Sequence, residues 1–159
     1  MLKISIVQFI KRGAFMRKKI IKLTALMFVL SAIGLTSGSA GDPDAVVGNW
    51  MVPAKDGTVQ IYKCGNHYCG KLSWLKTPGD KDTKNPDPAK RNDLLLGKVI
   101  LHSFKYDGDE WVKGKIYDPN DGKTYSCLMW LDGKDRLYVK GYIGISLIGR
   151  KELWTRVNK

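Results

Sequence analysis

Four Asp-Gly pairs punctuate the chain after residue 55 and constrain its fold more than any other feature. They are Asp56-Gly57, Asp107-Gly108, Asp121-Gly122 and Asp132-Gly133. Asp-Gly favours tight hairpin turns, because glycine readily adopts the positive φ values that these turns require. Each pair stands between runs rich in Val, Ile, Leu, Tyr and Trp, which are typical of β-strands. The sequence therefore predicts an antiparallel meander.

Eight strands are expected, and no helix is predicted after residue 40. The expected strands lie near residues 46–53, 58–64, 68–76, 96–105, 110–118, 123–131, 136–143 and 147–157. Eight such strands can form a sandwich, but short hairpin links favour an up-and-down barrel, which closes on itself and leaves no exposed edge. We therefore predict an all-β, eight-stranded antiparallel barrel.

The alternation of residues within the strands predicts which side chains face the barrel interior. Side chains alternate between the two faces of a strand, and apolar positions on neighbouring strands must share one face. The predicted interior set is Val59, Ile61, Leu72, Trp74, Val112, Ile116, Leu137 and Val139. Both faces of the strand near 123–131 carry apolar residues, so its orientation stays open.

Residues 76–93 form the longest predicted loop, which contains three prolines and interleaved charges. Loops of this length inside a compact domain are uncommon unless they are functional or disordered. The sequence leaves two interpretations open. The loop is either a lid over the mouth of the barrel or a solvated segment without a partner.

Residues 1–40 have the pattern of an export signal. Seven basic and no acidic residues are followed by an apolar run from Leu23 to Leu35 and by small residues up to Ala40. The run is shorter than the roughly 20 residues that cross a bilayer. We expect cleavage before Gly41, a single barrel domain over 41–159, and a periplasmic or secreted protein. A retained membrane anchor is the alternative, and Met16 is an alternative start.

The charge of the chain is concentrated in this N-terminal segment. The whole chain carries a formal charge of +12, which falls to +5 without residues 1–40. A weak field of this kind gives little support for nucleic-acid binding, which requires a basic face with interleaved aromatic residues. We expect no nucleic-acid partner and no stable membrane insertion after signal cleavage.

The segment Asp118-Pro119-Asn120-Asp121-Gly122 has the composition of a calcium loop. A helix-loop-helix calcium site requires glycine at position six and a closing glutamate at position twelve. Counted from Asp118, Gly122 falls at position five and Met129 at position twelve, so the pattern fails. The segment is interpreted as a hairpin corner, and no metal site is predicted there.

Several spaced motifs resemble those of the bacterial family called domain of unknown function 2147. The motifs are Gly48-Asn49-Trp50, CGNHYCGKL at 64–72, Asn85-Pro86 with Arg91 downstream, IYDPNDGKTY at 116–125 and GYIGISLIGRKELWTR at 141–156. The resemblance covers nearly all of the chain after residue 40. It implies an exported lipocalin-like or calycin-like barrel without an established reaction or ligand.

A second resemblance is to the lipocalins, which carry Gly-X-Trp on the first strand and an arginine on the last. Trp50 and Arg156 stand at the matching places, and the resemblance implies that the arginine packs on the indole at the closed end of the barrel. The chain departs from the lipocalin pattern in two ways. Its longest loop follows the third strand, and no C-terminal helix is expected.

Cys64 and Cys69 enclose a short segment that contains His67. A zinc site would need reduced thiols and a fourth ligand, whereas export favours a disulfide. The compartment and the family resemblance together predict the disulfide Cys64–Cys69, and zinc remains the alternative. Cys127 is then unpaired, and we expect a buried thiol.

No catalytic constellation is recognisable after residue 40. His67 and His102 are the only histidines there, and neither lies in a catalytic motif. Glu110 and Glu152 are the only glutamates, and most aspartates lie in turns. We therefore predict no enzyme activity, no catalytic residue and no cofactor, although an enzyme with an unrecognised site is a third hypothesis.

Two functional hypotheses remain, because the aromatic residues of the strands either line a pocket or fill the barrel. The first is a non-enzymatic barrel that binds a small apolar or amphipathic ligand. Its predicted pocket residues are Ile61, Leu72, Trp74, Ile116 and Val139. The alternative is an envelope interaction protein with a filled barrel that binds a protein or glycan partner.

Overall fold

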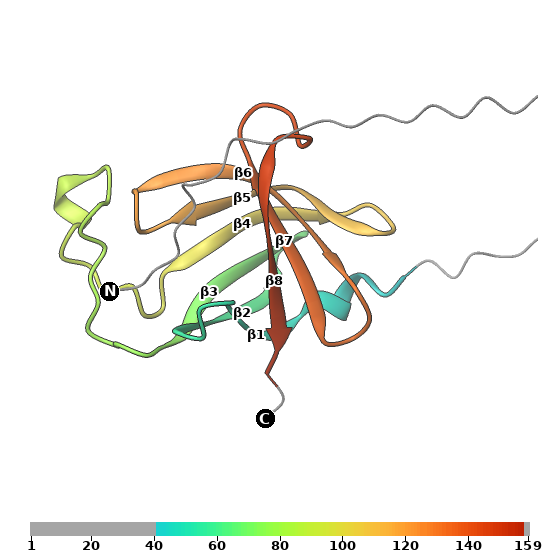
Figure 1. Ribbon diagram of the computed structural model, residues 1–159, viewed down its shortest axis with the longest axis horizontal. Helices are drawn as coiled ribbons and strands as arrows, with labels where there is room; N and C mark the ends of the chain where they lie inside the picture. The colour runs from blue at the N-terminus through green and yellow to red at the C-terminus, as the bar shows by residue number, and fades with distance from the viewer. Residues whose placement is uncertain (1–40, 158–159) are drawn as a thin grey trace, which may run out of the picture. The chain divides into compact units, whose positions relative to one another are not determined.

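The computed structural model describes residues 41–157, and the predicted export signal lies outside the described residues. Its elements are numbered along the chain (Figure 1). The strands are β1 (Gly48–Met51), β2 (Gly57–Cys64), β3 (His67–Leu75), β4 (Val99–Tyr106), β5 (Glu110–Asp118), β6 (Lys123–Leu131), β7 (Arg136–Tyr142) and β8 (Gly149–Arg156). Each overlaps one of the eight predicted strands.

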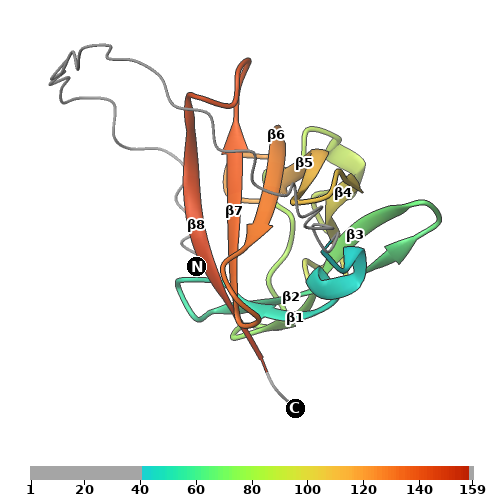
Figure 2. The same cartoon turned by 90° about the vertical axis from the view of Figure 1, so that its right-hand side faces the viewer.

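The strands form one closed antiparallel barrel. Every strand pairs with its neighbours in the sequence, and β1 also pairs with β8 (Figures 1 and 2). The prediction of an up-and-down barrel is confirmed. With this topology the connections β1–β2, β3–β4, β5–β6 and β7–β8 all lie at one end of the barrel, which we call the loop end. The chain enters and leaves at the other end, which we call the closed end.

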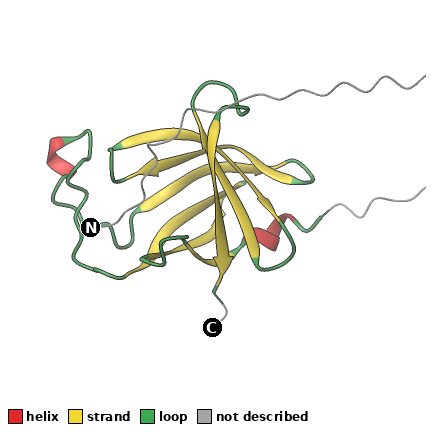
Figure 3. Ribbon diagram, viewed as in Figure 1, coloured by secondary structure: helices red, strands yellow, loops and turns green. Residues whose placement is uncertain are grey.

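Two short 3-10 helical turns accompany the strands, η1 (Pro43–Val46) and η2 (Pro88–Lys90) (Figure 3). Each follows an aspartate whose side chain accepts a hydrogen bond from a backbone N–H of the turn, Asp42 before η1 and Asp87 before η2. Single turns of this kind are too short to produce a helical hydrophobic period. They were therefore not expected from the sequence.

The turn η1 covers the closed end of the barrel. Its Val46 is fully buried in the core. The Trp50 indole N–H donates to the Val46 carbonyl oxygen over 2.8 Å, and the Trp111 indole N–H donates to that of Pro43 over 3.1 Å. The Tyr68 hydroxyl donates to the Asp44 carboxylate over 2.7 Å. Side chains from three strands thus hold η1 across this end.

Arg156, on the last strand β8, completes the closure of this end. We call its contacts with Trp50 and the backbone the seal. Its guanidinium carbon lies 4.1 Å from the centroid of the Trp50 ring, and Trp50 and Arg156 are direct partners in the β1–β8 ladder. Nη1 donates to the Val47 carbonyl oxygen over 2.9 Å and Nη2 to that of Ala45 over 2.6 Å. Nε donates to the Lys134 carbonyl oxygen over 2.7 Å. One side chain therefore connects β8, the β6–β7 turn and the segment before β1.

The part of the barrel next to this seal is packed with side chains. The fully buried residues there include Trp50, Val59, Ile61, Leu72, Leu101, Phe104, Trp111, Met129 and Leu137. Met129 and Cys127 are both fully buried, which settles the orientation of β6. Burying a large apolar side chain contributes about 1.5–3 kcal/mol, so this packed layer stabilises the barrel strongly.

The prediction that Trp74 points into the barrel is wrong. Thr58 pairs with Trp74 while the next residue of β2, Val59, pairs with Leu72, so Ser73 is an extra residue in β3. A β-bulge of this kind reverses the alternation of faces beyond it. Leu72 is buried, whereas Trp74 is 46% exposed on the outer wall.

The interior assignment of Val112 is also wrong, for the same physical reason. The β5–β6 register shifts between Trp111 and Gly114, and Lys113 has a φ of 59°. Trp111 is therefore buried in the place expected for Val112, which is only half-buried. Beyond the shift, Gly114 returns to the interior.

Because Gly114 has no side chain, the Phe104 ring can occupy the space beside its backbone. A Cβ atom at this position would lie 2.2 Å from the ring of Phe104, which is fully buried. We expect Gly114→Ala to lower the free energy of unfolding by about 1–3 kcal/mol, because the ring must leave its packed position. Urea denaturation measures the change. Gly79→Ala is the matched control, since nothing lies within 4 Å of its added methyl; an equal effect at both positions would refute the packing argument.

The Arg156 contacts require a planar guanidinium. Arg156→Lys keeps the charge but cannot reach several carbonyl oxygens while stacking on the indole. We expect the free energy of unfolding to fall by about 2 kcal/mol, because hydrogen bonds from charged donors are lost. Arg136→Lys is the control, since Arg136 makes an exposed ion pair with Asp132 and should contribute less than about 1 kcal/mol. Equal melting temperatures of the Arg156→Lys and Arg136→Lys variants would contradict this expectation.

Candidate functional site

A cavity of about 40 Å³, partly open to solvent, lies in the loop-end half of the barrel. Its apolar lining consists of Val52, Ile100, Ile116, Val139 and Trp154. The remaining lining residues are Tyr117, Asp118, Pro119, Tyr125, Gly141, Arg150 and Glu152. The space is large enough for several water molecules. The arrangement is an apolar hollow with polar side chains on its rim.

Only two of the five predicted pocket residues line this cavity, Ile116 and Val139. Ile61 and Leu72 are buried in the packed layer and are absent from the lining. Trp74 lies on the outer wall. The tryptophan that lines the cavity is instead Trp154, which is buried.

The charged rim residues of β8 were missed by the sequence analysis, although a signal for them exists. Arg150, Glu152 and Trp154 are two residues apart and share one face of the strand. The Arg150 guanidinium lies 3.3 Å from the Glu152 carboxylate, and the Trp154 indole N–H donates to the same carboxylate over 3.3 Å. The Arg150 side chain is 46% exposed, so the pair lies where the interior of the barrel opens to solvent.

The β5–β6 turn supplies the second polar group of the rim. Asp118 is buried, and one carboxylate oxygen accepts hydrogen bonds from the Asn120 backbone N–H over 2.9 Å and side-chain amide over 2.8 Å. Burial raises the pKa of the Asp118 carboxyl above its usual value, although these hydrogen bonds oppose the shift. The turn is the predicted hairpin corner, and its acidic residue faces the cavity.

Tyr125, near the start of β6, adds a hydroxyl group to the rim. Its hydroxyl donates to the Asp121 carboxylate. This hydrogen bond, together with burial, raises the pKa of the Tyr125 hydroxyl to about 12. The phenol therefore stays neutral at ordinary pH. The polar side chains of the lining are thus two phenols, two carboxyl groups and one guanidinium.

The loop 76–93 is anchored beside this end of the barrel by Asp82. The Asp82 carboxylate is fully buried and accepts a hydrogen bond from the Tyr117 hydroxyl over 2.6 Å and one from the Asn85 amide. The ammonium of Lys98 lies 2.8 Å from it. Burial acts to raise the pKa of Asp82, but the hydrogen bonds from Lys98, Tyr117 and Asn85 outweigh it and lower the pKa below the usual value.

Two further contacts hold the loop in place. Lys81 and Leu94 form an isolated antiparallel bridge, and the Lys84 carbonyl oxygen lies directly against Gly122 of the β5–β6 turn. No residue of 76–93 is among those that line the cavity. The loop therefore supports the β5–β6 turn and the Tyr117 ring, both of which contribute to the rim.

Asp82→Asn tests this anchor. The variant leaves Lys98 without its counter-ion in a mostly buried site, and we expect the free energy of unfolding at pH 7 to fall by about 3 kcal/mol. Because the folded-state pKa of Asp82 is depressed, its contribution is present above the unfolded value of about 3.9 and is lost as pH falls through the folded value. Urea denaturation from pH 7 to acid pH should therefore show that the free energy of unfolding falls less steeply with pH in the variant than in the wild type.

The control for this measurement is Asp87→Asn in the same loop. Asp87 pairs with Lys90 at 3.1 Å but is exposed, and asparagine also accepts the hydrogen bond from the Ala89 backbone N–H. We expect a change of less than about 1 kcal/mol. If both variants lost the same stability, the buried cluster around Asp82 would not be the anchor.

The cysteines lie away from the cavity. Cys64 and Cys69 form the predicted disulfide, which closes the β2–β3 hairpin at the closed end. Cys127 is unpaired and buried in the packed layer, and burial raises the pKa of its thiol far above the usual value. Among residues 41–157 no group of three or more His, Cys, Asp or Glu side chains is placed to hold a metal ion.

A closed eight-stranded barrel that is sealed by arginine over tryptophan and hollow at the other end defines the protein as lipocalin-like. A solved structure supports this class, namely the protein HP1028 from the human pathogen Helicobacter pylori, which is described as belonging to the lipocalin family. The two chains superpose with a TM-score of 0.65 at 22% identity, over 70% of this chain and 82% of the other. At this identity the likeness concerns the fold.

The sequence family is also established. The chain belongs to the family of uncharacterized proteins conserved in bacteria called DUF2147, whose profile matches residues 48–156. No curated protein matches this chain. Within the part of the chain that the structure describes, no helix is long and apolar enough to cross a membrane.

Proposed function

We propose that this protein is an exported, non-enzymatic binding protein that holds the apolar end of a small amphipathic molecule in its barrel. The observation that carries the proposal is the apolar cavity with its polar rim. A molecule bound there would bury its apolar end against Ile116, Val139 and Trp154 and place its polar end beside the Arg150–Glu152 pair. The cavity favours this function over that of a filled interaction module.

The small volume of the cavity limits what enters it. About 40 Å³ admits a narrow group such as the end of an alkyl chain, and a bulky ring system would require the barrel to open further. The half-buried rim residues Ile116, Tyr125 and Glu152 are the side chains that can turn outward. We therefore propose a linear amphipathic ligand.

Two observations support the absence of a reaction and the export. The rim carboxylates are engaged within the protein, Asp118 with Asn120 and Glu152 with Arg150 and Trp154, so neither is poised as a free base. The Cys64–Cys69 disulfide agrees with the oxidising compartment to which the predicted signal directs the chain.

Filling the cavity should abolish binding without unfolding the barrel. A Cβ atom at Gly141 would lie 3.6 Å from Ile116, an ordinary contact, so Gly141→Leu should fold with its side chain in the cavity. Displacing two ligand methylene groups should weaken binding about ten-fold. The probe is cis-parinaric acid, whose fluorescence rises in an apolar site, with dodecanoate and dodecylamine as competitors.

Gly79→Leu is the matched control, because it places the same side chain where nothing lies within 4 Å. Binding should also quench Trp154, so that Trp154→Phe removes the quenching and Trp74→Phe leaves it. Equal binding by the Gly141→Leu variant and its control, or no binding of any of the three probes to the wild type, would refute the proposal.

A further inference from the structure

The connection between β7 and β8 exposes more aliphatic surface than any other described segment. Ile143, Ile145, Leu147 and Ile148 are between 61% and 85% exposed. The other large apolar side chains on the described surface are at most 52% exposed. In two views the loop projects beyond the neighbouring strands (Figures 1 and 2). Clustered exposed apolar side chains mark interaction sites, whereas isolated ones require no explanation.

The loop presents these side chains in a defined turn. The Ile148 backbone N–H donates to the Ile145 carbonyl oxygen over 3.2 Å, and Gly144 has a φ of 73° that suits glycine. Residues 143–148 contain no charged residue. A simple hairpin connection is shorter and polar. This loop is therefore longer and more apolar than a connection between two strands requires.

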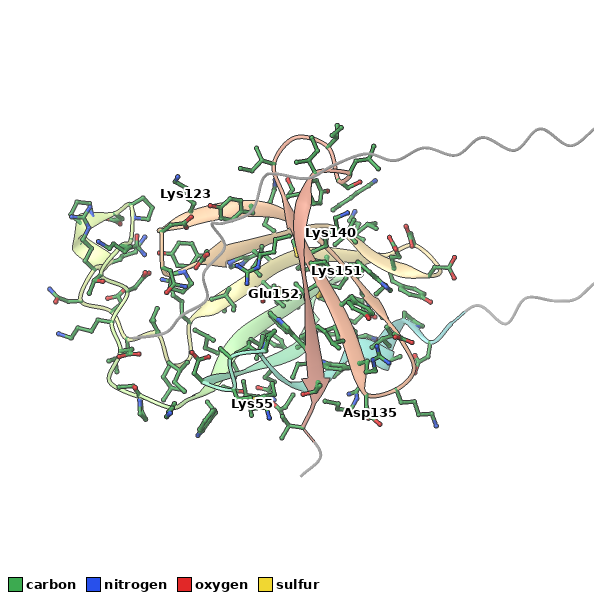
Figure 4. All side chains as sticks on the ribbon, in the orientation of Figure 1. Lys55, Lys123, Asp135, Lys140, Lys151 and Glu152 are labelled. Carbon is green, nitrogen blue, oxygen red and sulfur yellow. A yellow bond between two sulfur atoms is a disulfide. The ribbon has the colours of Figure 1, made fainter. Side chains whose placement is uncertain are left out.

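Basic side chains lie on the two strands that lead into the loop. Lys140 pairs with Lys151 and Gly141 with Arg150 in the β7–β8 ladder. Figure 4 shows Lys140 and Lys151 on the strands that lead to the loop, and the Lys151 ammonium lies over the Tyr138 ring, 4.5 Å from its centroid. The nearest acidic residue on these strands, Glu152, is mostly buried and is paired with Arg150. An apolar tip above a basic collar matches an anionic lipid surface, in which acyl chains lie beneath negatively charged headgroups.

The same charges disfavour a second copy of the chain as the occupant. Packing two loops against each other would cover the apolar tips but would leave the ammonium groups of Lys140 and Lys151 without a complementary partner. An anionic bilayer satisfies both the apolar tip and the basic collar. The charge pattern therefore selects the lipid surface.

We propose that the β7–β8 loop docks this protein reversibly onto an anionic phospholipid bilayer, with the tip residues 143–148 in the headgroup region. Gly141 and Arg150, which flank the loop, also line the cavity. Docking thus turns the mouth of the barrel toward the bilayer. An amphipathic molecule can then pass between the barrel and the bilayer with little exposure to water. This last consequence rests on the proposed function, whereas the docking does not.

Vesicle co-sedimentation of the full chain recovered from an expressing bacterium tests the docking. We expect binding to vesicles of phosphatidylcholine mixed with phosphatidylglycerol and weak binding to phosphatidylcholine alone. The double variant Ile145→Ser, Leu147→Ser should bind the anionic vesicles about ten-fold less, because two side chains no longer enter the interface. Leu94→Ser with Leu96→Ser is the matched control on another surface and should bind as the wild type does.

The electrostatic part has its own variants. Lys140→Gln and Lys151→Gln should each weaken binding to anionic vesicles about five-fold at low salt and leave the weak binding to neutral vesicles unchanged. Ile145→Trp supplies a direct readout, because an inserted indole is quenched by brominated acyl chains. Quenching by lipids brominated along the chain supports insertion.

Three outcomes would overturn the proposal. They are equal vesicle binding by the loop double variant and the wild type, absence of wild-type binding to anionic vesicles, and a wild-type dimer that the loop double variant converts to a monomer. Failure of the docking is distinguishable from failure of the proposed function. The loop double variant should still bind cis-parinaric acid in solution, and Gly141→Leu should still bind vesicles.

Discussion

The stacking of Arg156 on Trp50 joins the last strand of the barrel to the first, and the closed architecture depends on it. The β1–β8 pairing is the shortest in the barrel, with two residue pairs. The guanidinium adds backbone hydrogen bonds to Ala45 and Val47, which fold η1 over this end. One end is sealed and packed, and the cavity opens at the other end.

The architecture was predictable because its signals are local. Asp-Gly pairs such as Asp121-Gly122 end strands, and the alternation of residues such as Val59 and Ile61 identifies an inner face. Periodicity failed at Trp74 and Val112, where one extra residue in a strand reverses the faces. A bulge depends on the partner strand, so a single strand's sequence carries little sign of it.

The site was less predictable than the fold, for a different reason. A cavity is the volume that side chains from many strands leave unfilled, and no local pattern reports it. Ile116 and Val139 were identified because they are apolar and inward. Glu152 and Asp118 were not identified, because the search for inward apolar residues leaves out charged ones. Their carboxylates accept hydrogen bonds from Trp154 and Asn120, which no local pattern predicts.

The placement of the three cysteines has a consequence for oxidative folding. Three thiols allow three pairings, but Cys64 and Cys69 are five residues apart, whereas Cys127 is far along the chain. The effective concentration of one thiol at another falls with the length of the intervening chain, so the native pair forms first in an oxidising compartment. Closure of the barrel then removes Cys127 from oxidants and from exchange. The short separation of Cys64 and Cys69 and the burial of Cys127 together disfavour mispaired and intermolecular disulfides.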